Sequence, residues 1–282
     1  ADLLDAAEAA SAQQLLSMPP AELTRRLWRL VAPALLQSHQ PLMIMYTSGT
    51  SGFKPRGLVY DHAGFVSGAV LTMETCFDVR EGSDVILVHA TPAWITGQTY
   101  AITGALASRA TTVIAPPELT PRVLSAIVSF SSVSIFVASA SFLKRALPSE
   151  DDTSFLRGQQ LSKSLRIACS CGEPLSAHAH ALGMETLTPQ YVNTYWATEH
   201  GSIVLSHAYG NLSQPLRSDS RMQPLPWAGV EVWVPESNGR FHPAAENGSE
   251  KGLLVCTKPW PSMARTAWGC ADELGAPGWR GD

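Results

Sequence analysis

The sequence predicts an α/β protein, in which a mostly parallel sheet carries helices on both faces and a small β-rich subdomain follows. The first observation is that short apolar runs alternate with helical patterns between about residues 42 and 185. This alternation is typical of parallel strands joined by helices that cover the sheet. The second is a change after about Met222, where short alternating segments and turn residues predict further strands. We therefore expect an N-terminal helical segment at residues 1–40, an α/β core at 41–222 and the β-rich subdomain at 223–282.

The elements are expected in the following order along the chain. An Ala-rich stretch predicts a helix over residues 4–16, and Pro19-Pro20-Ala21-Glu22 opens a second helix, since proline suits a first helical turn. Apolar runs predict strands at residues 42–46, 84–89, 112–115, 134–138 and 166–170. Helices are expected at residues 61–74, 98–108, 121–130, 139–147 and 176–185. In the tail, strands are expected at residues 230–234 and 252–256, with a turn at 237–240.

The uncharged stretch at residues 85–108 raises the question of a membrane span. It contains His89, Pro92 and Gln98, and its apolar residues fall into short runs. A buried strand, a loop and a helix therefore fit it better than one spanning helix. The first residues lack a basic segment followed by an apolar one, so we do not expect them to form a signal peptide. We expect no membrane partner.

Composition narrows the class of protein further. The chain has 282 residues, of which 45% are hydrophobic and 16% charged, so it can bury a sizeable core. A formal net charge of -4 argues against a nucleic-acid partner. The cysteines are scattered, and Cys169-x-Cys171 is too closely spaced for the usual zinc site. We expect reduced, buried thiols and a cytoplasmic protein.

The segment from Tyr46 to Gly57 is the most informative part of the chain. It combines hydroxyl side chains, glycines and two cations directly after an apolar strand. Glycine lets backbone N–H groups approach a ligand, and hydroxyls, N–H groups and positive charge together suit a polyphosphate. The spacing does not match a Walker loop, Gly-x-x-x-x-Gly-Lys-Ser/Thr. Taken alone, the segment is equally compatible with a flexible surface loop.

Two later stretches strengthen the polyphosphate interpretation. Residues 171–175 follow the strand predicted at 166–170, and residues 191–201 form a short strand that ends in aromatic residues, a hydroxyl and a carboxylate. Aromatic faces stack on a purine, and a Glu carboxylate offers the oxygen ligand that Mg²⁺ prefers. Ligands of parallel sheets bind at the carboxyl ends of the strands, where all three stretches are expected.

With these motifs in order, the chain resembles the AMP-binding core of the adenylate-forming enzymes, which include acyl-CoA synthetases, firefly luciferase and nonribosomal peptide synthetase adenylation domains. It is most similar to the acetyl-CoA and propionyl-CoA synthetase branch. The residues that carry this similarity are Trp94-Ile95-Thr96-Gly97-Gln98-Thr99-Tyr100, Gly172-Glu173-Pro174, Trp196 and the segment from Lys258 to Thr266. The resemblance extends from about residue 42 to the last residue.

The resemblance implies a role for each motif. The phosphate loop would hold the ATP phosphates through Thr47, Ser48, Gly49, Thr50, Ser51, Gly52, Lys54 and Arg56. The adenine and ribose would be flanked by Gly172, Glu173, Pro174, Asn193, Thr194, Tyr195 and Asp282. Thr198 would bind the α-phosphate, and Glu199 would coordinate Mg²⁺. The acyl pocket would be lined by Trp94, Ile95, Thr96, Cys171 and Trp196, with Trp196 as a wall that restricts it to short acids.

The implied reaction has two steps. A short-chain carboxylate such as acetate or propionate would react with ATP and Mg²⁺ to form an acyl-adenylate, and coenzyme A would then accept the acyl group. The family completes this chemistry with a mobile C-terminal domain and its catalytic lysine. Because the chain stops at Asp282, we expect it to be a piece of a longer enzyme with further domains and to be inactive or only feebly active by itself.

The sequence also departs from the family pattern. Phe53 and Lys54 both stand between the last loop glycine and Pro55, where the family has one residue, and Arg56 replaces a lysine. Asn193 and Ala197 replace an aspartate and a glutamine. These differences leave open a nucleotide-binding pseudoenzyme or scaffold domain. A third interpretation keeps adenylation but transfers the acyl group to a carrier protein.

Some residues have simpler structural interpretations. His178 and His180 are expected on an exposed helix face, His200 and His207 are expected to be structural, and Arg265 is expected to be a buried structural cation. Trp94, Trp196 and Trp260 would serve as ordinary core residues as well.

Overall fold

The computed structural model describes residue 14 and residues 17–31, 34–47, 55–146, 149–207, 216–219, 221–245 and 248–268. The chain divides into two compact units, Ala1–Gln37 and Ser38–Asp282. In the first unit, helix α2 (Pro20–Val31) begins at the second of the two prolines, as predicted. The helix expected at residues 4–16 lies outside the described residues, apart from Gln14.

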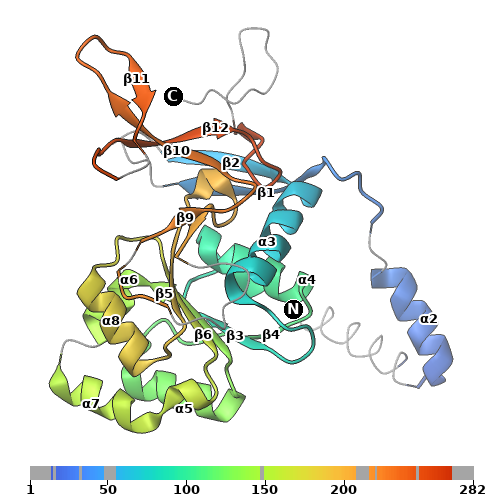
Figure 1. Ribbon diagram of the computed structural model, residues 1–282. Coiled ribbons are helices and arrows are strands. Elements are labelled where there is room, and N and C mark those ends of the chain that lie inside the picture. Colours follow the sequence, from blue (N-terminus) through green and yellow to red (C-terminus); the bar gives the residue numbers. More distant parts are fainter. Residues whose placement is uncertain are drawn as a thin grey trace, which may run out of the picture. The chain divides into compact units, whose positions relative to one another are not determined.

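The second unit is built on a seven-stranded sheet in the order β4-β3-β5-β6-β7-β8-β9. Strands β3 (Val85–Val88), β4 (Thr111–Val113), β5 (Ile135–Ser139), β6 (Ile167–Cys171) and β7 (Tyr191–Tyr195) pair in parallel (Figure 1). The short strands β8 (Leu205–Ser206) and β9 (Gln223–Pro224) extend the sheet antiparallel. The mostly parallel sheet predicted from the sequence is confirmed.

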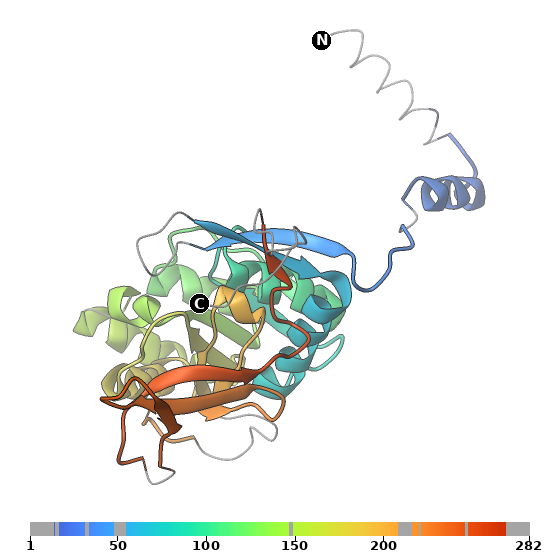
Figure 2. The same ribbon diagram turned by 90° about the horizontal axis from the view of Figure 1, so that it is seen from above.

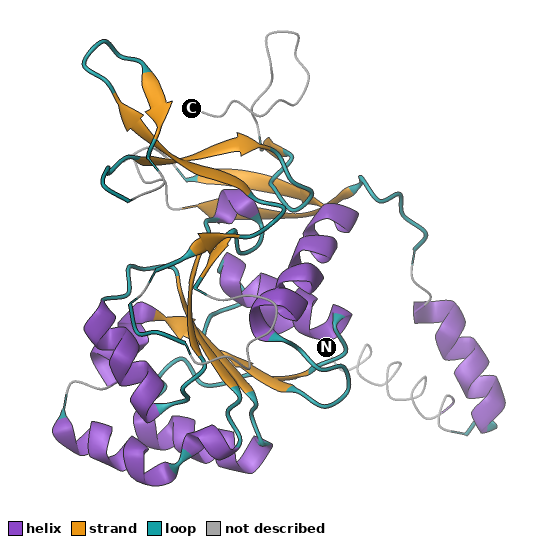
Figure 3. Ribbon diagram, in the orientation of Figure 1, coloured by secondary structure: helices purple, strands orange, loops and turns teal. Residues whose placement is uncertain are grey.

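Helices cover both faces of this sheet (Figure 3). One face packs against α3 (His62–Phe77), the π-helix η1 (Gly97–Gly104) and α4 (Ala105–Ala107). The other packs against α5 (Pro121–Ser131), α6 (Ala140–Ala146), α7 (Glu150–Gln159) and α8 (Ala177–Thr186), with the short 3₁₀-helix η2 (Leu161–Lys163) after α7. Strand β5 shows why two cores form, because Ile135 and Val137 face the first set of helices and Phe136 and Ala138 face the second.

The strand predicted at residues 42–46 exists, but its place in a parallel sheet was predicted wrongly. Strand β1 (Pro41–Thr47) pairs antiparallel with β2 (Arg56–Asp61), and β2 also pairs with β13 (Thr266–Ala267) (Figure 2). The physical reason is the short connection, because a parallel neighbour needs a crossover of about a dozen residues or more. Strand β2 was not predicted, since Arg56 and Gly57 were assigned to the loop.

The β-rich tail has one sheet of its own, in the order β11-β10-β12. Its strands are β10 (Gly229–Pro235), β11 (Phe241–Pro243) and β12 (Leu253–Lys258), and the predicted turn joins the first two. Strands β9 and β13 also lie after Met222, but they pair with β8 and β2 in the other sheets. The boundary near residue 222 stays a prediction.

Two helical segments differ from expectation. The segment at residues 98–108 is helical, but most of it is the π-helix η1 rather than an α-helix. Helix α7 was not predicted; Ser149 caps it by accepting a hydrogen bond from the Asp152 N–H. Among the described helices, none is both long enough and apolar enough to cross a membrane.

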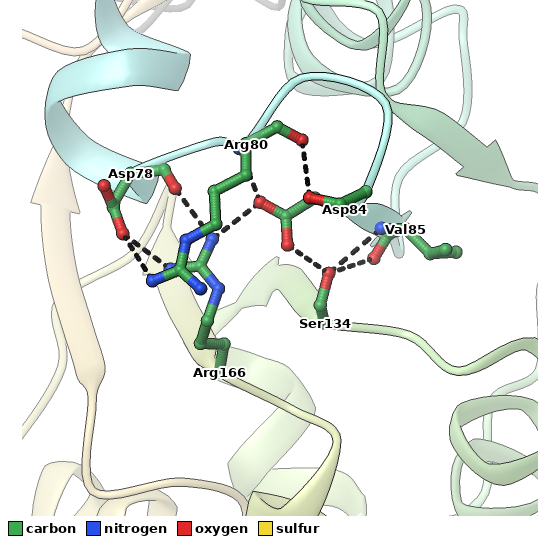
Figure 4. Close-up of polar contacts among 7 residues, drawn as sticks. Asp78, Arg80, Asp84, Val85, Ser134 and Arg166 are labelled. Atoms are coloured by element: carbon green, nitrogen blue, oxygen red, sulfur yellow. Dashed lines mark hydrogen bonds and ion pairs between the residues drawn. The ribbon is translucent and has the colours of Figure 1, made fainter.

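A polar cluster joins the amino ends of three parallel strands (Figure 4). Arg166 donates to the Asp78 carboxylate at 2.8 Å, to the Asp78 carbonyl at 2.7 Å and to the Asp84 carboxylate at 2.6 Å. Asp84 also accepts from the Ser134 hydroxyl at 2.7 Å. Because these residues precede β6, β3 and β5, the cluster fixes the edge of the sheet opposite to the predicted site.

Candidate functional site

The predicted site residues that the structure describes lie at the carboxyl ends of β6 and β7 and around them. The phosphate-loop residues Ser48, Gly49, Thr50, Ser51, Gly52 and Lys54, together with Asp282, lie outside the described residues. Their roles therefore stay predictions. The flanks of the loop are described, because Thr47 ends β1, Arg56 begins β2 and the two residues face each other in the hairpin register.

A tight turn follows β7 and carries Thr198 and Glu199. This turn is the 3₁₀-helix η3 (Thr198–His200), which ends at Gly201 with φ of 73°. The Ala264 N–H donates to the Glu199 carbonyl at 3.0 Å. The His200 carbonyl accepts from the Ser262 hydroxyl at 2.9 Å and from the Trp260 indole at 3.2 Å. The segment at residues 260–264, which the resemblance singled out, therefore holds the turn.

The side chains of Thr198 and Glu199 are half-buried at this turn. Within the described part of the chain, no hydrogen bond or ion pair reaches the Thr198 hydroxyl or the Glu199 carboxylate. A half-buried carboxylate and hydroxyl that have no protein partner fit a hard cation and an anionic oxygen, which would supply the missing interactions. The donor set thus suits Mg²⁺ together with a phosphate group.

Tyr60 reaches this turn from strand β2, and sequence reasoning missed it. Its side chain is 1% exposed, and its hydroxyl donates to the Thr198 carbonyl. Burial first and the nearby Glu199 charge second raise the pKa of Tyr60 well above its ordinary value. No signal in the sequence pointed to Tyr60, because its partner Thr198 lies 138 residues further along the chain.

The predicted acyl-pocket residues lie close together. The Cys171 thiol is 4.0 Å from the Thr96 hydroxyl, and Trp196 is buried in the same core as Cys171. The ring of Trp94 lies against Gly172, since a Cβ there would be 3.0 Å from it. Ile95 is buried in the same core as Cys171 and Trp196. The structure therefore joins the end of β6, the end of β7 and the start of η1.

Trp196 also packs against a buried tyrosine that sequence reasoning did not assign to the site. Its ring lies edge-on to Tyr100, with centroids 5.3 Å apart. The Tyr100 hydroxyl lies 2.9 Å from that of Thr72 and accepts from the Ile203 N–H at 3.0 Å. Burial raises the pKa of Tyr100, so the phenol stays protonated. The π-helix η1 thus fixes the proposed wall through Tyr100.

The predicted adenine-side residues take different positions. Gly172, Glu173 and Pro174 are exposed just after β6, with Gly172 at φ of 78°. Thr194 is buried and its hydroxyl donates to the Ser170 carbonyl at 2.9 Å, so this hydroxyl is used within the sheet. Asn193 is 3% exposed, whereas Tyr195 is partly exposed and contacts the ring of His200.

His200 has a defined tautomer within this region. Its Nδ1 accepts from the Ala197 N–H at 3.0 Å, so Nε2 carries the proton and points to the Cys256 thiol at 3.6 Å. Burial lowers the pKa of His200 to about 4, which keeps the ring neutral. Cys256 is exposed, contrary to the expectation of buried thiols, whereas Cys76, Cys169 and Cys171 are buried and free as expected.

Two further expectations were wrong. His180 is fully buried rather than exposed, because α8 turns this face toward β7 and its ring nitrogen contacts the Tyr191 carbonyl at 2.7 Å. Arg265 is not buried, since 60% of its side chain is exposed. It pairs at 2.8 Å with Asp61, which also caps α3 by accepting from the Gly64 N–H.

A hollow of about 590 Å³ lies near the carboxyl ends of β3 and β4, to one side of these residues. Its lining includes His89, Pro117, Phe142 and Asp152, and none of the predicted site residues. The His89 ring nitrogen contacts the Pro117 carbonyl at 3.0 Å, so two residues that line the hollow are hydrogen-bonded to each other. The acid-sized space expected beside Trp196 stays a prediction.

Comparison with known proteins agrees with these motifs. An acetyl-coenzyme A synthetase of Pyrobaculum aerophilum is 36% identical over 245 residues, which cover 85% of this chain and 35% of that protein. Those of Helicobacter pylori strain HPAG1 and Mycolicibacterium smegmatis are each 32% identical over 84% of this chain, and the match covers 35% and 25% of their lengths. The chain thus spans about a third or less of these relatives. Residues 2–265 match the profile of a family described as AMP-binding enzyme, and the chain belongs to that family.

Proposed function

We propose that this chain is the nucleotide-binding part of an enzyme that uses ATP to activate a short-chain carboxylate and passes the acyl group to coenzyme A. The observation that carries the proposal is the turn after β7. There, a hydroxyl and a carboxylate that have no partner among the described residues stand at the carboxyl edge of a parallel sheet. The relatives are acetyl-coenzyme A synthetases, and this supports the reaction class and coenzyme A as the acceptor.

The proposed chemistry begins with attack of a carboxylate oxygen on the α-phosphorus of ATP. A bond forms between that oxygen and phosphorus, the bond to the bridging oxygen breaks, and pyrophosphate leaves. The thiol of coenzyme A then attacks the acyl carbon, AMP leaves, and the thiol proton passes to solvent. The main barrier is repulsion between two anions, so positioning and electrostatics dominate the protein's part.

The chain's own residues divide this work. The Thr198 hydroxyl would donate to an α-phosphate oxygen, and the Glu199 carboxylate would hold Mg²⁺. When bound, Mg²⁺ would neutralise phosphate charge and polarise the phosphorus. Arg56 at the end of the hairpin, and Lys54 before it, would offset the charge of the departing pyrophosphate. Tyr195, partly exposed beside the turn, offers a ring face for the adenine.

The proposed substrate is a small acid because Trp196 would form a bulky wall of the acyl pocket near Cys171. Trp196 is 6% exposed and packs edge-on against Tyr100, whose hydroxyl is fixed on both sides. A long acyl chain could enter only by displacing this pair. Acetate and propionate fit best with such a wall.

A second candidate function is nucleotide binding without chemistry, within a larger protein. It is favoured by the extra residue in the phosphate loop and by Asn193 and Ala197, which reduce the charge and hydrogen-bonding groups on the nucleotide side. A carrier protein in place of coenzyme A is the remaining alternative.

Pyrophosphate exchange separates these functions. The protein encoded by the whole reading frame that contains this chain should exchange labelled pyrophosphate into ATP only when acetate or propionate is present. Exchange with transfer to coenzyme A supports the proposal, whereas exchange with transfer only to a phosphopantetheinylated carrier supports the carrier alternative. ATP binding without exchange would overturn the enzymatic proposal and favour the nucleotide-binding module.

The wall is tested by shortening Trp196. In the whole protein, Trp196→Gly should shift the preference, measured as kcat/KM, toward longer acids by at least about ten-fold, since a few buried methylenes are worth about 1–3 kcal/mol. The same change opens a cavity and lowers stability by about 3–5 kcal/mol, so the milder Trp196→Leu serves as a second variant. An unchanged chain-length profile in both folded variants would remove Trp196 from the pocket.

A further inference from the structure

Tyr60 connects two sheets that the predicted site draws upon. It belongs to β2, the strand that leaves the phosphate loop, while its hydroxyl donates to the Thr198 carbonyl beyond the end of β7. Its ring packs against Phe65 with centroids 5.2 Å apart, and the side chain is 1% exposed. The aromatic ring is therefore held by the core, and only the hydroxyl reaches the turn.

A second connection between strand β2 and the turn after β7 runs through residues 264 and 265. The Arg265 N–H donates to the Val59 carbonyl at 2.8 Å, and the neighbouring Ala264 N–H donates to the Glu199 carbonyl at 3.0 Å. Strand β2 is thus tied to the carbonyls of both Thr198 and Glu199. These two carbonyls lie on either side of the Glu199 Cα, so together the bonds hold the stretch of backbone from which its carboxylate projects.

The Tyr60 hydroxyl acts as a donor at all ordinary pH values. Burial and the Glu199 charge both disfavour the phenolate, so the pKa of Tyr60 lies far above neutrality. A phenylalanine at position 60 would keep the ring packing and leave the half-buried Thr198 carbonyl without this donor.

We propose that Tyr60 is a positioning residue, which couples the hairpin that carries the phosphate loop to the Thr198–Glu199 turn and so sets the geometry for Mg²⁺-bound nucleotide. The inference rests on the proposed function and deepens it, because it assigns a role to a residue outside the three motifs. Tyr60 does not touch the reacting atoms. It acts through the peptide unit between Thr198 and Glu199, which orients both side chains.

The test uses Tyr60→Phe in the full chain, with Tyr191→Phe as the matched control. Tyr191 begins β7 and is 1% exposed, but its hydroxyl has no hydrogen-bond partner among the described residues. Calorimetric titration with ATP is carried out with Mg²⁺ and with EDTA. We expect Tyr60→Phe to weaken binding of ATP with Mg²⁺ about ten-fold, while binding without Mg²⁺ changes less than three-fold. Tyr191→Phe should match the unaltered chain in both titrations.

A readout independent of the ligand is amide hydrogen exchange. Loss of the Tyr60 hydroxyl should speed exchange at Glu199–Ile203 and leave the amides of α5 and α8 unchanged. If Tyr60→Phe binds ATP with Mg²⁺ as tightly as the unaltered chain, the positioning role is wrong. Equal weakening with and without Mg²⁺, with faster exchange throughout the chain, would show a merely structural residue and would also overturn it. Absence of ATP binding by the unaltered chain would instead overturn the proposed function, and this role with it.

Discussion

Arg166 is the residue on which the amino edge of the main sheet depends. It forms ion pairs with Asp78 and Asp84, and only 4% of the Asp84 side chain is exposed (Figure 4). Arg166→Leu would leave this buried carboxylate without its cation, and breaking a buried pair from one side is strongly destabilising. We expect the free energy of unfolding, measured by urea titration, to fall by about 3 kcal/mol.

Arg157 provides the matched comparison for that experiment. It also contacts two carboxylates, those of Glu150 at 2.9 Å and Glu185 at 2.8 Å, but all three side chains are well exposed. Arg157→Leu should therefore change stability far less than Arg166→Leu, because solvent screens exposed pairs. Equal losses of stability in the two variants would show that the burial of Asp84 does not determine how much the Arg166 cluster stabilises the fold.

His200 should make stability depend on pH. Burial lowers its pKa to about 4, whereas in the unfolded chain the imidazole has its ordinary pKa of 6.5. Between these values the unfolded chain binds the extra proton, so stability is present in full above pH 6.5 and is lost as pH falls toward 4. His200→Asn keeps an acceptor for the Ala197 N–H but does not titrate. At about pH 4, the unaltered chain should have lost about 3 kcal/mol of its free energy of unfolding through His200, and His200→Asn should not show this loss.

The measurement is urea unfolding of both proteins at about pH 7.5 and pH 4.5. His180 and His207 also have lowered pKa values through burial, but they titrate in both proteins, so their contribution cancels in the difference. Parallel stability curves for the unaltered chain and His200→Asn would contradict the prediction.

For single residues, chemical roles could be proposed from the motifs, but the burial of a side chain was harder to predict. Thr198 and Glu199 could be selected from the motif because their chemistry suits a phosphate and a cation. His180 and Arg265 were assigned the wrong environments, since burial depends on which helix face meets the sheet and not on the residue type. Tyr60 could not be selected at all, because its partner Thr198 is distant in sequence and its hydrogen bond exists only in the folded chain.

Among the elements, the turn after β7 depends on one glycine. Gly201 has φ of 73°, and a Cβ there would lie 1.9 Å from the Ser262 carbonyl oxygen. Gly201→Ala must therefore move either the turn or the segment at residues 260–264. We expect a stability loss on the order of 3 kcal/mol and loss of ATP binding, measured by urea titration and calorimetry.

Gly239 separates backbone strain from this clash. It has φ of 80° in the turn between β10 and β11, and a Cβ there meets nothing within 4 Å. Gly239→Ala should lower the free energy of unfolding by only about 1–2 kcal/mol, which is the cost of the left-handed conformation for alanine. It should bind ATP normally. If both variants behaved alike, the contact between Gly201 and Ser262 would not position the turn.

The elements also show where periodicity succeeds and where it fails. Strands β3, β5 and β6 were predicted almost to their ends, because both faces are buried and their sequences are continuous apolar runs. The π-helix η1 was predicted only as a helix, since the added turn width leaves no pattern in the residue types. Strand β2 was missed because glycine and cations suggested a loop, whereas antiparallel pairing with β1 decides its conformation.

For the whole molecule, sequence order did not reveal which strands share a sheet. The chain passes from β1 and β2 through the main sheet and returns at β13 to pair with β2. That return brings the segment at residues 260–264 against the turn after β7, which no local pattern predicts. The family resemblance pointed to this segment indirectly, because the residues from Lys258 to Thr266 are among those that carry the similarity.

This arrangement predicts how nucleotide should affect the stability of the entire second unit. A ligand that contacts both the β1–β2 hairpin and the Thr198–Glu199 turn binds only when the two sheets are assembled, so binding and unfolding compete. ATP with Mg²⁺ at a hundred times its dissociation constant should raise the free energy of unfolding by about 2.7 kcal/mol.

Glu199→Gln should remove the Mg²⁺-dependent share of this increase, because an amide does not replace a carboxylate as a ligand for the cation. Glu81→Gln, which alters an exposed carboxylate paired with Arg109 away from the site, should retain the full increase. Thermal and urea unfolding with ATP and Mg²⁺, with ATP and EDTA, and with neither would measure it. An equal Mg²⁺ effect in both variants would show that the cation binds elsewhere.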